Sequence, residues 1–148
     1  MKLSTKGDYG VRAMIALAKR WGEGPVQRHD IAERRQIPES YLDHLLGQLR
    51  RAGFVRSTRG PGGGHELAMP PEEICLLHVL EALEGSLAPM QCVESGRSEE
   101  ESICGQAWVW ENIYGHMRQA LGETSLEDLV NHELEHEQQT TRAGSYSI

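Results

Sequence analysis

A five-residue motif near the C-terminal end has the spacing of a zinc hydrolase. Residues 132–136 read His-Glu-Leu-Glu-His. On a helix, His132 and His136 can share one metal ion while Glu133 acts as a base on metal-bound water. The context argues against this interpretation, because the segment is polar and acidic, offers no clear third ligand and has no apolar wall to exclude water. A solvated, charged helix explains these residues better, and we expect that the protein is not an enzyme.

The other residues with metal or redox chemistry are the three cysteines Cys75, Cys92 and Cys104. An odd number argues against a disulfide framework and favours a reducing compartment. The N-terminus lacks the apolar stretch of a secretory signal, and no run approaches the roughly 18 apolar residues of a transmembrane helix. We therefore expect a cytoplasmic protein without membrane contact.

The charges are polarised along the 148-residue chain. Residues 1–67 carry 12 Lys and Arg against 7 Asp and Glu, a balance of +5. Residues 68–148 carry 3 against 15, a balance of −12, which gives the net charge of −7. A basic half is typical of nucleic-acid binding, whereas an acidic half is repelled by the same phosphates. The N-terminal half is therefore the candidate nucleic-acid-binding part.

The basic half has the pattern of a helix-turn-helix followed by a hairpin. Apolar residues at helical spacing predict helices over 5–22, 28–36 and 39–52. The buried stripe expected for the third helix is Leu42, Leu45, Leu46 and Leu49. Two β-like runs, 54–58 and 66–69, then flank a glycine-rich turn that begins with Arg59. Glycines there let the backbone approach a groove closely, so the hairpin is the wing of a winged helix.

The acidic half is predicted to be helical with one irregular segment. A helix is expected over about 70–84, an irregular segment over 85–102 and a long helix over 103–121. Apolar residues of the long helix alternate by four and three, as in a helix–helix seam. They are Ile103, Ala107, Trp110, Tyr114, Met117 and Leu121. We favour a dimer interface for this stripe, and the alternative is core within one chain. A capping box in Thr124-Ser125-Leu126-Glu127 predicts one last short helix, with a frayed polar segment beyond it.

Several short motifs of this chain occur together in one family of bacterial regulators. They are residues 1–10, Ile31-Ala32-Glu33, Ser40-Tyr41-Leu42, Leu49-Arg50-Arg51-Ala52-Gly53, the wing segment 59–64 and Thr124-Ser125-Leu126-Glu127-Asp128-Leu129. Over about residues 1–130 the chain resembles the Rrf-two (BadM type) family of winged-helix transcriptional regulators. That family includes regulators of iron–sulfur, nitric-oxide and cysteine metabolism.

The resemblance implies a homodimer on a palindromic operator of double-stranded DNA. The helix over 39–52 would enter the major groove, and the wing would reach the adjacent minor groove. The residues expected to contact DNA are Lys2, Lys6, Ser40, Tyr41, Asp43, His44, Arg50, Arg51, Arg59, Gly60, Gly62, Gly63 and Gly64. His44 is expected to face base edges, while the lysines and the arginines of the helix anchor phosphates. The family usually has tyrosine after the wing glycines; here His65 stands there, which we expect to alter wing packing without removing the wing.

The resemblance also implies an iron–sulfur ligand set, of which this chain has only part. Cys92 and Cys104 match the first and last cysteines of the family's cluster loop, but the middle position is Ser98. The family's histidine ligand falls at Ala107, and some relatives use an acidic residue at the position of Asp8. We expect a labile 2Fe-2S cluster on the two cysteines, with Asp8 as a further candidate ligand. The alternative is a pair of plain or redox-sensing thiols.

A cluster-free branch of the same family senses cysteine status by binding cysteine synthase through an aromatic-rich tail that ends in isoleucine. This chain ends with Tyr146-Ser147-Ile148, which is similar. A free carboxylate beside one apolar side chain suits a pocket that captures C-termini. The alternative partner is therefore cysteine synthase, bound through Ile148, unless the tail is simply disordered.

The predicted protein is mainly α with a small β wing. A winged helix-turn-helix DNA-binding domain with a supporting helix occupies 1–84, and a cluster or sensor loop follows over 85–102. A dimerisation helix and a short C-terminal helix occupy 103–135, and a flexible tail occupies 136–148. The expected function is a homodimeric, DNA-binding transcriptional repressor that senses iron–sulfur, redox or nitric-oxide status.

Overall fold

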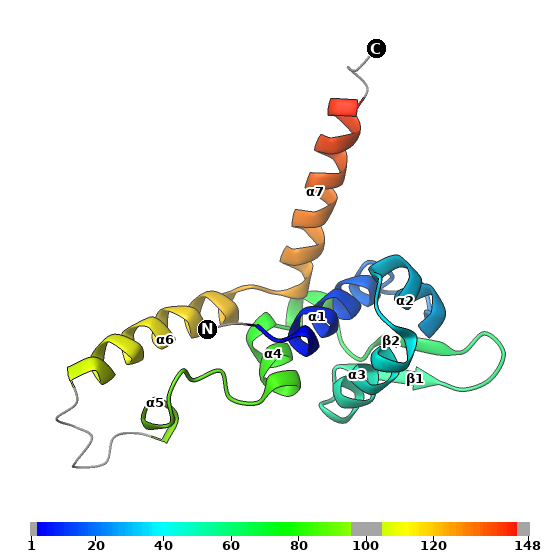
Figure 1. Ribbon diagram of the computed structural model, residues 1–148. Coiled ribbons are helices and arrows are strands. Elements are labelled where there is room, and N and C mark those ends of the chain that lie inside the picture. Colours follow the sequence, from blue (N-terminus) through cyan, green and yellow to red (C-terminus); the bar gives the residue numbers. More distant parts are fainter. Residues whose placement is uncertain (1–2, 96–104, 145–148) are drawn as a thin grey trace.

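The computed structural model describes residues 3–95 and 105–144, with a helical head from which two long helices, α6 and α7, extend (Figure 1). The elements are α1 (Thr5–Ala18), α2 (Arg28–Arg35), α3 (Glu39–Arg51), β1 (Val55–Thr58), β2 (Gly64–Leu67), the 3-10 turn η1 (Pro71–Glu73), α4 (Leu76–Glu84), α5 (Gln91–Ser95), α6 (Gly105–Glu123) and α7 (Leu126–Gly144). β1 and β2 form a two-stranded antiparallel sheet, which confirms a mainly α fold with a small β wing. Within these ranges no helix is long and apolar enough to cross a membrane.

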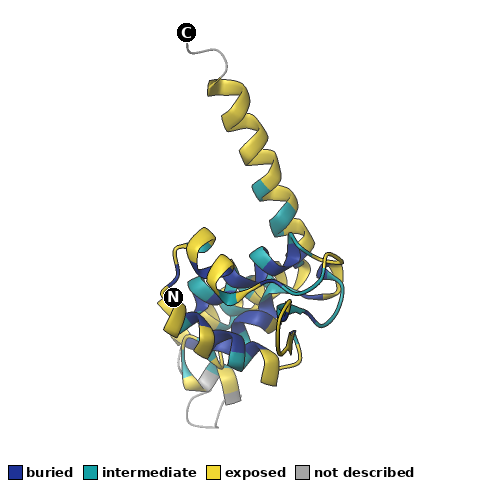
Figure 2. Ribbon diagram, turned by 90° about the vertical axis from the view of Figure 1, so that its right-hand side faces the viewer, coloured by how far each residue is buried: buried dark blue, intermediate teal, exposed yellow. Residues whose placement is uncertain are grey.

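The main core lies where α1 packs against α2, α3 and α4. The predicted leucine stripe of α3, residues 42, 45, 46 and 49, is at most 1% exposed. Met14 and Leu17 of α1 and Leu126 of α7 join the same cluster. Figure 2 shows buried residues gathered in the head, whereas most of α7 is exposed. Because burial of apolar surface is the main stabilising term, this packing fixes α3 with its polar side outward.

Two glycines let the end of α4 approach α1 closely. A Cβ atom at Gly10 would lie 2.2 Å from Leu83 Cδ1, and one at Gly7 would lie 2.4 Å from Glu84 Oε1. Glu84 Oε1 accepts hydrogen bonds from the N–H groups of Ser4 (3.2 Å) and Gly7 (3.0 Å) and from the Ser4 hydroxyl. A carboxylate in this place satisfies free N–H groups at the start of the helix. The last residue of α4 therefore holds the first turn of α1.

The fourth helix begins later than predicted. Instead of one helix over 70–84, the chain forms η1, an extended stretch and then α4. The extended Cys75 pairs with Ser125: Leu76 N–H donates to Thr124 O (2.8 Å), and Leu126 N–H donates to Ile74 O (2.9 Å). These bonds tie the start of α4 to the connection between α6 and α7. Sequence periodicity does not reveal such a long-range pairing.

The predicted end of the first helix is also wrong. α1 ends at Ala18 rather than at residue 22, and Trp21 is 41% exposed. The chain turns through Gly22 and Gly24 and then brings Val26 to β2, where Val26 and His65 exchange backbone hydrogen bonds of 2.8 Å. This pairing requires the chain to leave the helix early.

The C-terminal helix is much longer than predicted. The expected short helix and the flexible tail from residue 136 are replaced, as far as Gly144, by the single helix α7. Its cap is one residue later than the predicted box, because Ser125 Oγ accepts from Asp128 N–H (3.1 Å) and Asp128 Oδ2 accepts from Ser125 N–H (2.8 Å). These hydrogen bonds lower the pKa of Asp128. Between Ser125 and Gly144 there is neither proline nor glycine, so no residue there breaks the helix.

One side of α6 packs on its own chain. Tyr114, Met117 and Leu121 contact a second apolar cluster formed by Leu77, Leu80 and Leu87. Ala107 is also buried, at 1% exposure. This part of the predicted seam is therefore covered within the chain, which is the alternative that the sequence left open. Ile103 lies outside the described residues.

The other apolar residues of α6 are exposed. Val109 and Ile113 lie one turn apart and are 41% and 52% exposed, and Trp108 and Trp110 are 64% and 36% exposed. Monomeric proteins rarely leave so many large apolar side chains together in water. Trp110 lies on the side of α6 that faces its own chain, near Leu87 and Met90. The other three residues, Trp108, Val109 and Ile113, are called the α6 apolar face below.

Candidate nucleic-acid interface

A tight turn between α2 and α3 sets the orientation of α3. Gln36 ends α2 in the left-handed region (φ 55°), as no other non-glycine residue in the described ranges does. The buried Ile37 donates its N–H to Ala32 O (2.9 Å), and α3 begins directly after Pro38. Ser40 and His44, one turn apart, are therefore exposed on the outer side of α3, as residues that read bases must be.

A cluster of charges joins the first residue of α2 to the exposed side of α3. Arg28 Nη1–H donates to Asp43 Oδ1 (2.7 Å), and Nε–H donates to Glu39 Oε1 (3.2 Å). The bond to Asp43, followed by that to Glu39, raises the pKa of Arg28. Asp43, expected to contact DNA, is thus partnered within the protein. The sequence did not single out Arg28. The available signal was the spacing of Glu39 and Asp43, which places two carboxylates one helical turn apart, where one cation can bind both.

Tyr41 connects α3 to α1. It is half-buried, and its ring centre lies 5.9 Å from that of Tyr9 in an edge-to-face arrangement. The Arg12 guanidinium lies 5.6 Å from the centre of the Tyr9 ring. Arg12 also binds both carboxylate oxygens of Asp8, at 3.0 and 2.9 Å. Tyr41 therefore helps to orient α3 relative to α1.

The wing is a short hairpin beside α3, and its loop extends beyond the helices (Figure 1). Val55 pairs with Leu67 at its base, and Thr58 pairs with Gly64 at its end. Gly63 is buried in the turn, where a Cβ atom would lie only 2.2 Å from Thr58 O. Gly63 is therefore required to close the hairpin, while Gly60 and Gly62 are exposed in the loop with Arg59.

His65 lies in the wing without disrupting it. Its Nδ1 is 2.7 Å from Ser57 Oγ across the hairpin, and its backbone pairs with Val26. Burial lowers the pKa of His65, and the neighbouring positive charges of Arg28 and Arg50 act in the same direction, against the opposing charge of Asp43. Burial therefore favours the neutral form of this side chain, which lies within the electrostatic reach of α3.

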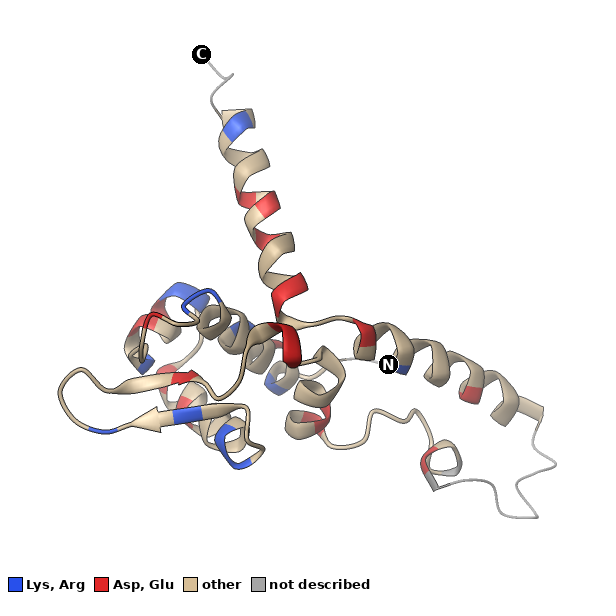
Figure 3. Cartoon of the chain, turned by 180° about the vertical axis from the view of Figure 1, so that it is seen from behind, with Lys and Arg blue, Asp and Glu red and all other residues tan. Residues whose placement is uncertain are grey.

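Three arginines of α3 and the wing carry side chains without a partner in the described part of the chain. The side chains of Arg50, Arg51 and Arg59 are exposed and have no hydrogen bond or ion pair within residues 3–95 and 105–144. The Lys6 side chain on α1 is half-buried and also has no such partner in these ranges. Arg56, in contrast, is paired with Glu66 (2.7 Å), and Lys2 lies outside the described ranges. Figure 3 shows Lys and Arg concentrated in the head and acidic residues along α7. We define the reading face as the exposed residues Ser40, His44, Arg50, Arg51 and Arg59.

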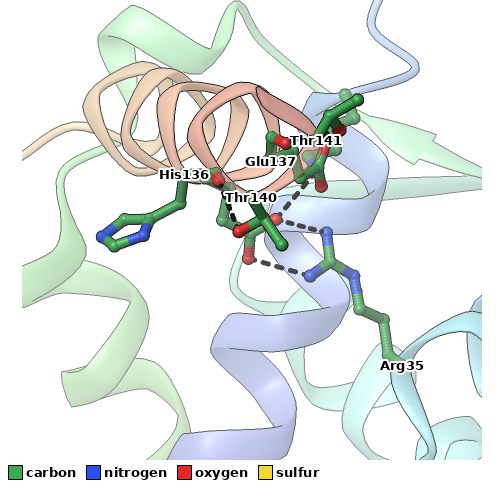
Figure 4. A network of polar contacts seen from close by, with 7 residues as sticks. Arg35, His136, Glu137, Thr140 and Thr141 are labelled. Atoms are coloured by element: carbon green, nitrogen blue, oxygen red, sulfur yellow. Dashed lines mark hydrogen bonds and ion pairs between the residues drawn. The ribbon is translucent and has the colours of Figure 1, made fainter. Parts of the chain in front are cut away.

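A second group of cations is paired with α7 instead. Arg35 binds both oxygens of Glu133 (2.9 and 3.1 Å), and Lys19 binds Glu133 (2.9 Å) and Glu137 (2.8 Å), as Figure 4 shows for Arg35. Burial alone would raise the pKa of Glu133, but the hydrogen bonds from Arg35 and Lys19 outweigh it and lower that pKa. These four residues are called the α7 clasp.

The comparisons with known proteins agree with this geometry. The family model Rrf2, described as an iron-dependent transcriptional regulator, matches residues 3–132. The chain belongs to the Rrf2 family. It is a transcriptional regulator of the DNA-binding, helix-turn-helix type and not an enzyme.

Relatives of this Rrf2 protein include regulators with different names. The HTH-type transcriptional regulator CymR of Bacillus subtilis is 39% identical over 132 residues, which are 89% of this chain and 91% of that protein. The solved structure of CymR, titled the global cysteine regulator of B. subtilis, has a TM-score of 0.77 at 38% identity and covers 89% of this chain and 98% of that one. The structure of IscR from T. potens has a TM-score of 0.72 at 39% identity, covering 90% and 88%. The winged-helix fold is thus shared with both.

The predicted cluster ligands of this Rrf2 chain lie largely outside the part that the structure describes. Cys92 belongs to α5, but its side chain is not described, and Ser98, Cys104 and the tail residue Ile148 lie outside the described ranges. The carboxylate of Asp8 is occupied by Arg12. Among the described residues no group of three or more potential ligands is close enough to hold a metal ion. The Glu133 of the hydrolase motif is bound in the α7 clasp and is not available as a base.

Proposed function

We propose that this Rrf2 regulator represses transcription by binding a palindromic operator as a homodimer. α3 enters the major groove, where Ser40 and His44 meet the DNA, and the wing places Arg59 in the adjacent minor groove. The observation that carries this proposal is the reading face. Its two polar side chains lie on the exposed side of α3, and its three arginines have no partner in the described part of the protein.

The reading face divides into two chemical roles. An imidazole at a base edge discriminates sequence, whereas arginines on phosphates set affinity and its salt dependence. An arginine in a narrow minor groove senses groove shape more than base identity. In a dimer the two recognition helices would contact half-sites about one helical turn, ~34 Å, apart.

Selection of binding sites from a random duplex library tests this proposal. The full-length protein should enrich a palindrome, with both half-sites protected in a footprint. Enrichment of a single, asymmetric half-site would contradict the dimer, and absence of any enriched sequence would contradict sequence-specific regulation.

The α6 apolar face supports the choice of a second copy as the partner in assembly. Trp108, Val109 and Ile113 are exposed. The side of α6 that carries Tyr114, Met117 and Leu121 is already packed on its own chain. Crossing of two α6 helices would remove the exposed side chains from water, at about 25 cal/mol per Å² of buried apolar surface. Ile113→Asp should convert the dimer into a monomer in analytical ultracentrifugation, whereas the control Gln138→Asp, at an exposed position of α7 away from this face, should not. A wild-type monomer at micromolar concentration would refute the dimer.

The candidate metal-ligating residues favour a regulator that senses its signal without an iron–sulfur cluster. Only two cysteines lie in the family's cluster loop, Ala107 is buried against this chain's own core, and Asp8 is held by Arg12. These residues do not supply the four ligands of a 2Fe-2S cluster within one chain. CymR, titled a global cysteine regulator, is similar over most of the chain, which supports a role in cysteine metabolism.

Anaerobic purification with iron and sulfide assays separates the two signals. A colourless, iron-free protein is the expected result, and it leads to a binding assay with cysteine synthase. Deletion of Ile148 should then abolish that binding. A coloured protein with stoichiometric iron and sulfide would instead establish the cluster hypothesis for Cys92 and Cys104, with Asp8 as the next ligand to substitute.

A further inference from the structure

We propose that His132 and His136 form a chelating site for one divalent transition-metal ion on the outer side of α7. The two side chains lie one turn apart on a regular helix, and their ring centres are 5.0 Å apart with an angle of 80° between the ring planes. Two imidazoles bound to one zinc ion at about 2.1 Å each have ring centres separated by roughly 5 Å at a tetrahedral angle. The existing separation therefore matches a shared ion without movement of the backbone.

Both imidazoles are available for this role. His132 and His136 are exposed, their rings contact each other, and within the described ranges neither ring has a hydrogen bond or an ion pair. In Figure 4 the imidazole of His136 points away from Arg35 and hence from the α7 clasp. The ion would therefore bind on the solvent side of α7 without competing with the ion pairs that hold this helix.

The site would bind metal without hydrolytic chemistry. Glu133, which would be the base of a zinc hydrolase, is bound by Arg35 and Lys19, and its lowered pKa reflects that pairing. The described residues provide only these two ligands, so water would complete the coordination. Imidazole nitrogen favours zinc, nickel and copper, whereas calcium and magnesium prefer oxygen ligands. The ligand class is therefore a borderline transition-metal ion.

Such an ion would stabilise the part of α7 that follows the family match. The Rrf2 model ends at residue 132, so His136 and both clasp glutamates lie beyond it. A chelate between His132 and His136 closes one helical turn, and binding to the folded helix alone stabilises that helix in proportion to metal concentration. The site is independent of the proposed DNA binding.

Calorimetric titration of the full-length protein with Ni²⁺ tests the proposal. Wild-type protein should bind one ion per chain at this site, and His132→Ala or His136→Ala should each weaken that binding by about tenfold or more. The matched control is His116→Ala, because His116 is exposed on α6 and its Nδ1 lies 2.8 Å from Asn112 O. This control and Glu133→Gln should both retain wild-type affinity.

A spacing control distinguishes a chelate from a simple count of histidines. In the His136→Ala chain, Gln139→His restores two histidines but places them two turns apart, so it should not restore binding. Circular dichroism confirms that each variant keeps its helices. Wild-type affinity in His132→Ala, or restored affinity in the spacing control, would overturn the proposal. A loss in Glu133→Gln as large as in the histidine variants would also overturn it, because it would make the glutamate a ligand.

Discussion

Two groups of basic residues in the N-terminal half differ in what surrounds them. Arg50, Arg51 and Arg59 of the reading face have no acidic partner among the described residues, whereas Lys19 and Arg35 of the α7 clasp are bonded to glutamates of α7. Unpaired surface cations remain available to phosphate, while paired cations hold an element of the fold in place. The total charge of the basic half therefore does not identify a nucleic-acid-binding surface, whereas the pairing of each cation does.

The largest expected effect comes from removing two arginines of the reading face, compared with removing the two cations of the α7 clasp. The double substitution Arg50→Ala with Arg51→Ala should make the negative slope of log binding constant against log salt shallower by roughly 2, because each phosphate contact contributes about −0.9. Lys19→Ala with Arg35→Ala should leave the slope unchanged, since these cations are neutralised by α7. Fluorescence anisotropy on one operator at several salt concentrations measures both. Equal changes of slope in the two double variants would contradict the assignment of the unpaired arginines, rather than the clasp cations, as the residues that contact phosphate.

The joint between α1 and α4 connects the reading face to the C-terminal half. Gly10→Ala should destabilise the protein by about 1–3 kcal/mol, because its Cβ would overlap Leu83 and the core would be overpacked. The control is Gly115→Ala on α6, where nothing lies within 4 Å of the added atom. Thermal unfolding measures both. A Gly10→Ala protein as stable as the control would show that the contact between α1 and α4 is looser than described.

The α7 clasp predicts a dependence of stability on pH. Glu133 has a folded-state pKa below its ordinary value of 4.5, so its contribution is present above that value and is lost as the pH falls through the folded pKa. Burial lowers the pKa of Lys19, but its bonds to Glu133 and Glu137 outweigh this and raise it above 10.5, so its contribution is lost only at higher pH. Glu133→Gln should lower the free energy of unfolding by about 1 kcal/mol near neutral pH. The effect is modest because the clasp is partly exposed to solvent. The difference from wild type should shrink below about pH 4.5; a constant difference down to pH 3 would contradict the ion pair.

The smallest effect is expected at the wing. Because burial lowers the pKa of His65 below 6.5, the unfolded state binds more protons, and stability should fall as the pH decreases through 6.5 toward the folded pKa. NMR titration of the imidazole should report a pKa below 6.5. A value above 6.5 would mean that the wing leaves this side chain in water or pairs it with Asp43.

Local patterns were sufficient to predict the DNA-binding unit. The leucine stripe of α3, the short gap between the helices predicted over 28–36 and 39–52, and the glycine run of the wing depend on residues close in sequence. The structure confirms the helix-turn-helix and the hairpin. The reading-face residues followed from the same patterns and from the family resemblance. Their role in DNA contact remains a prediction. Asp43, which was also expected to contact DNA, is not part of the reading face because it is paired with Arg28.

The features that the sequence did not reveal depend on residues far apart in the chain. The pairing of Cys75 with Ser125 shortens α4, and the clasp with Lys19 and Arg35 accompanies the unexpected length of α7. Likewise, a heptad-like stripe on α6 does not reveal whether its partner is another chain or α4, because both offer the same apolar surface. Such contacts carry no local periodic signal.

The most direct test of the central claim is a comparison of His44→Ala and Arg59→Ala across a set of operator variants. Binding free energies are measured for wild type and both variants on duplexes that differ either in the half-site bases or in the A·T content of the flanking minor groove. The account predicts that His44→Ala loses discrimination among half-site bases with little change in salt slope. Arg59→Ala should instead lose affinity mainly on duplexes with a narrow minor groove. Equal losses on every duplex for both variants would contradict the assignment of α3 and the wing as the surface that reads DNA.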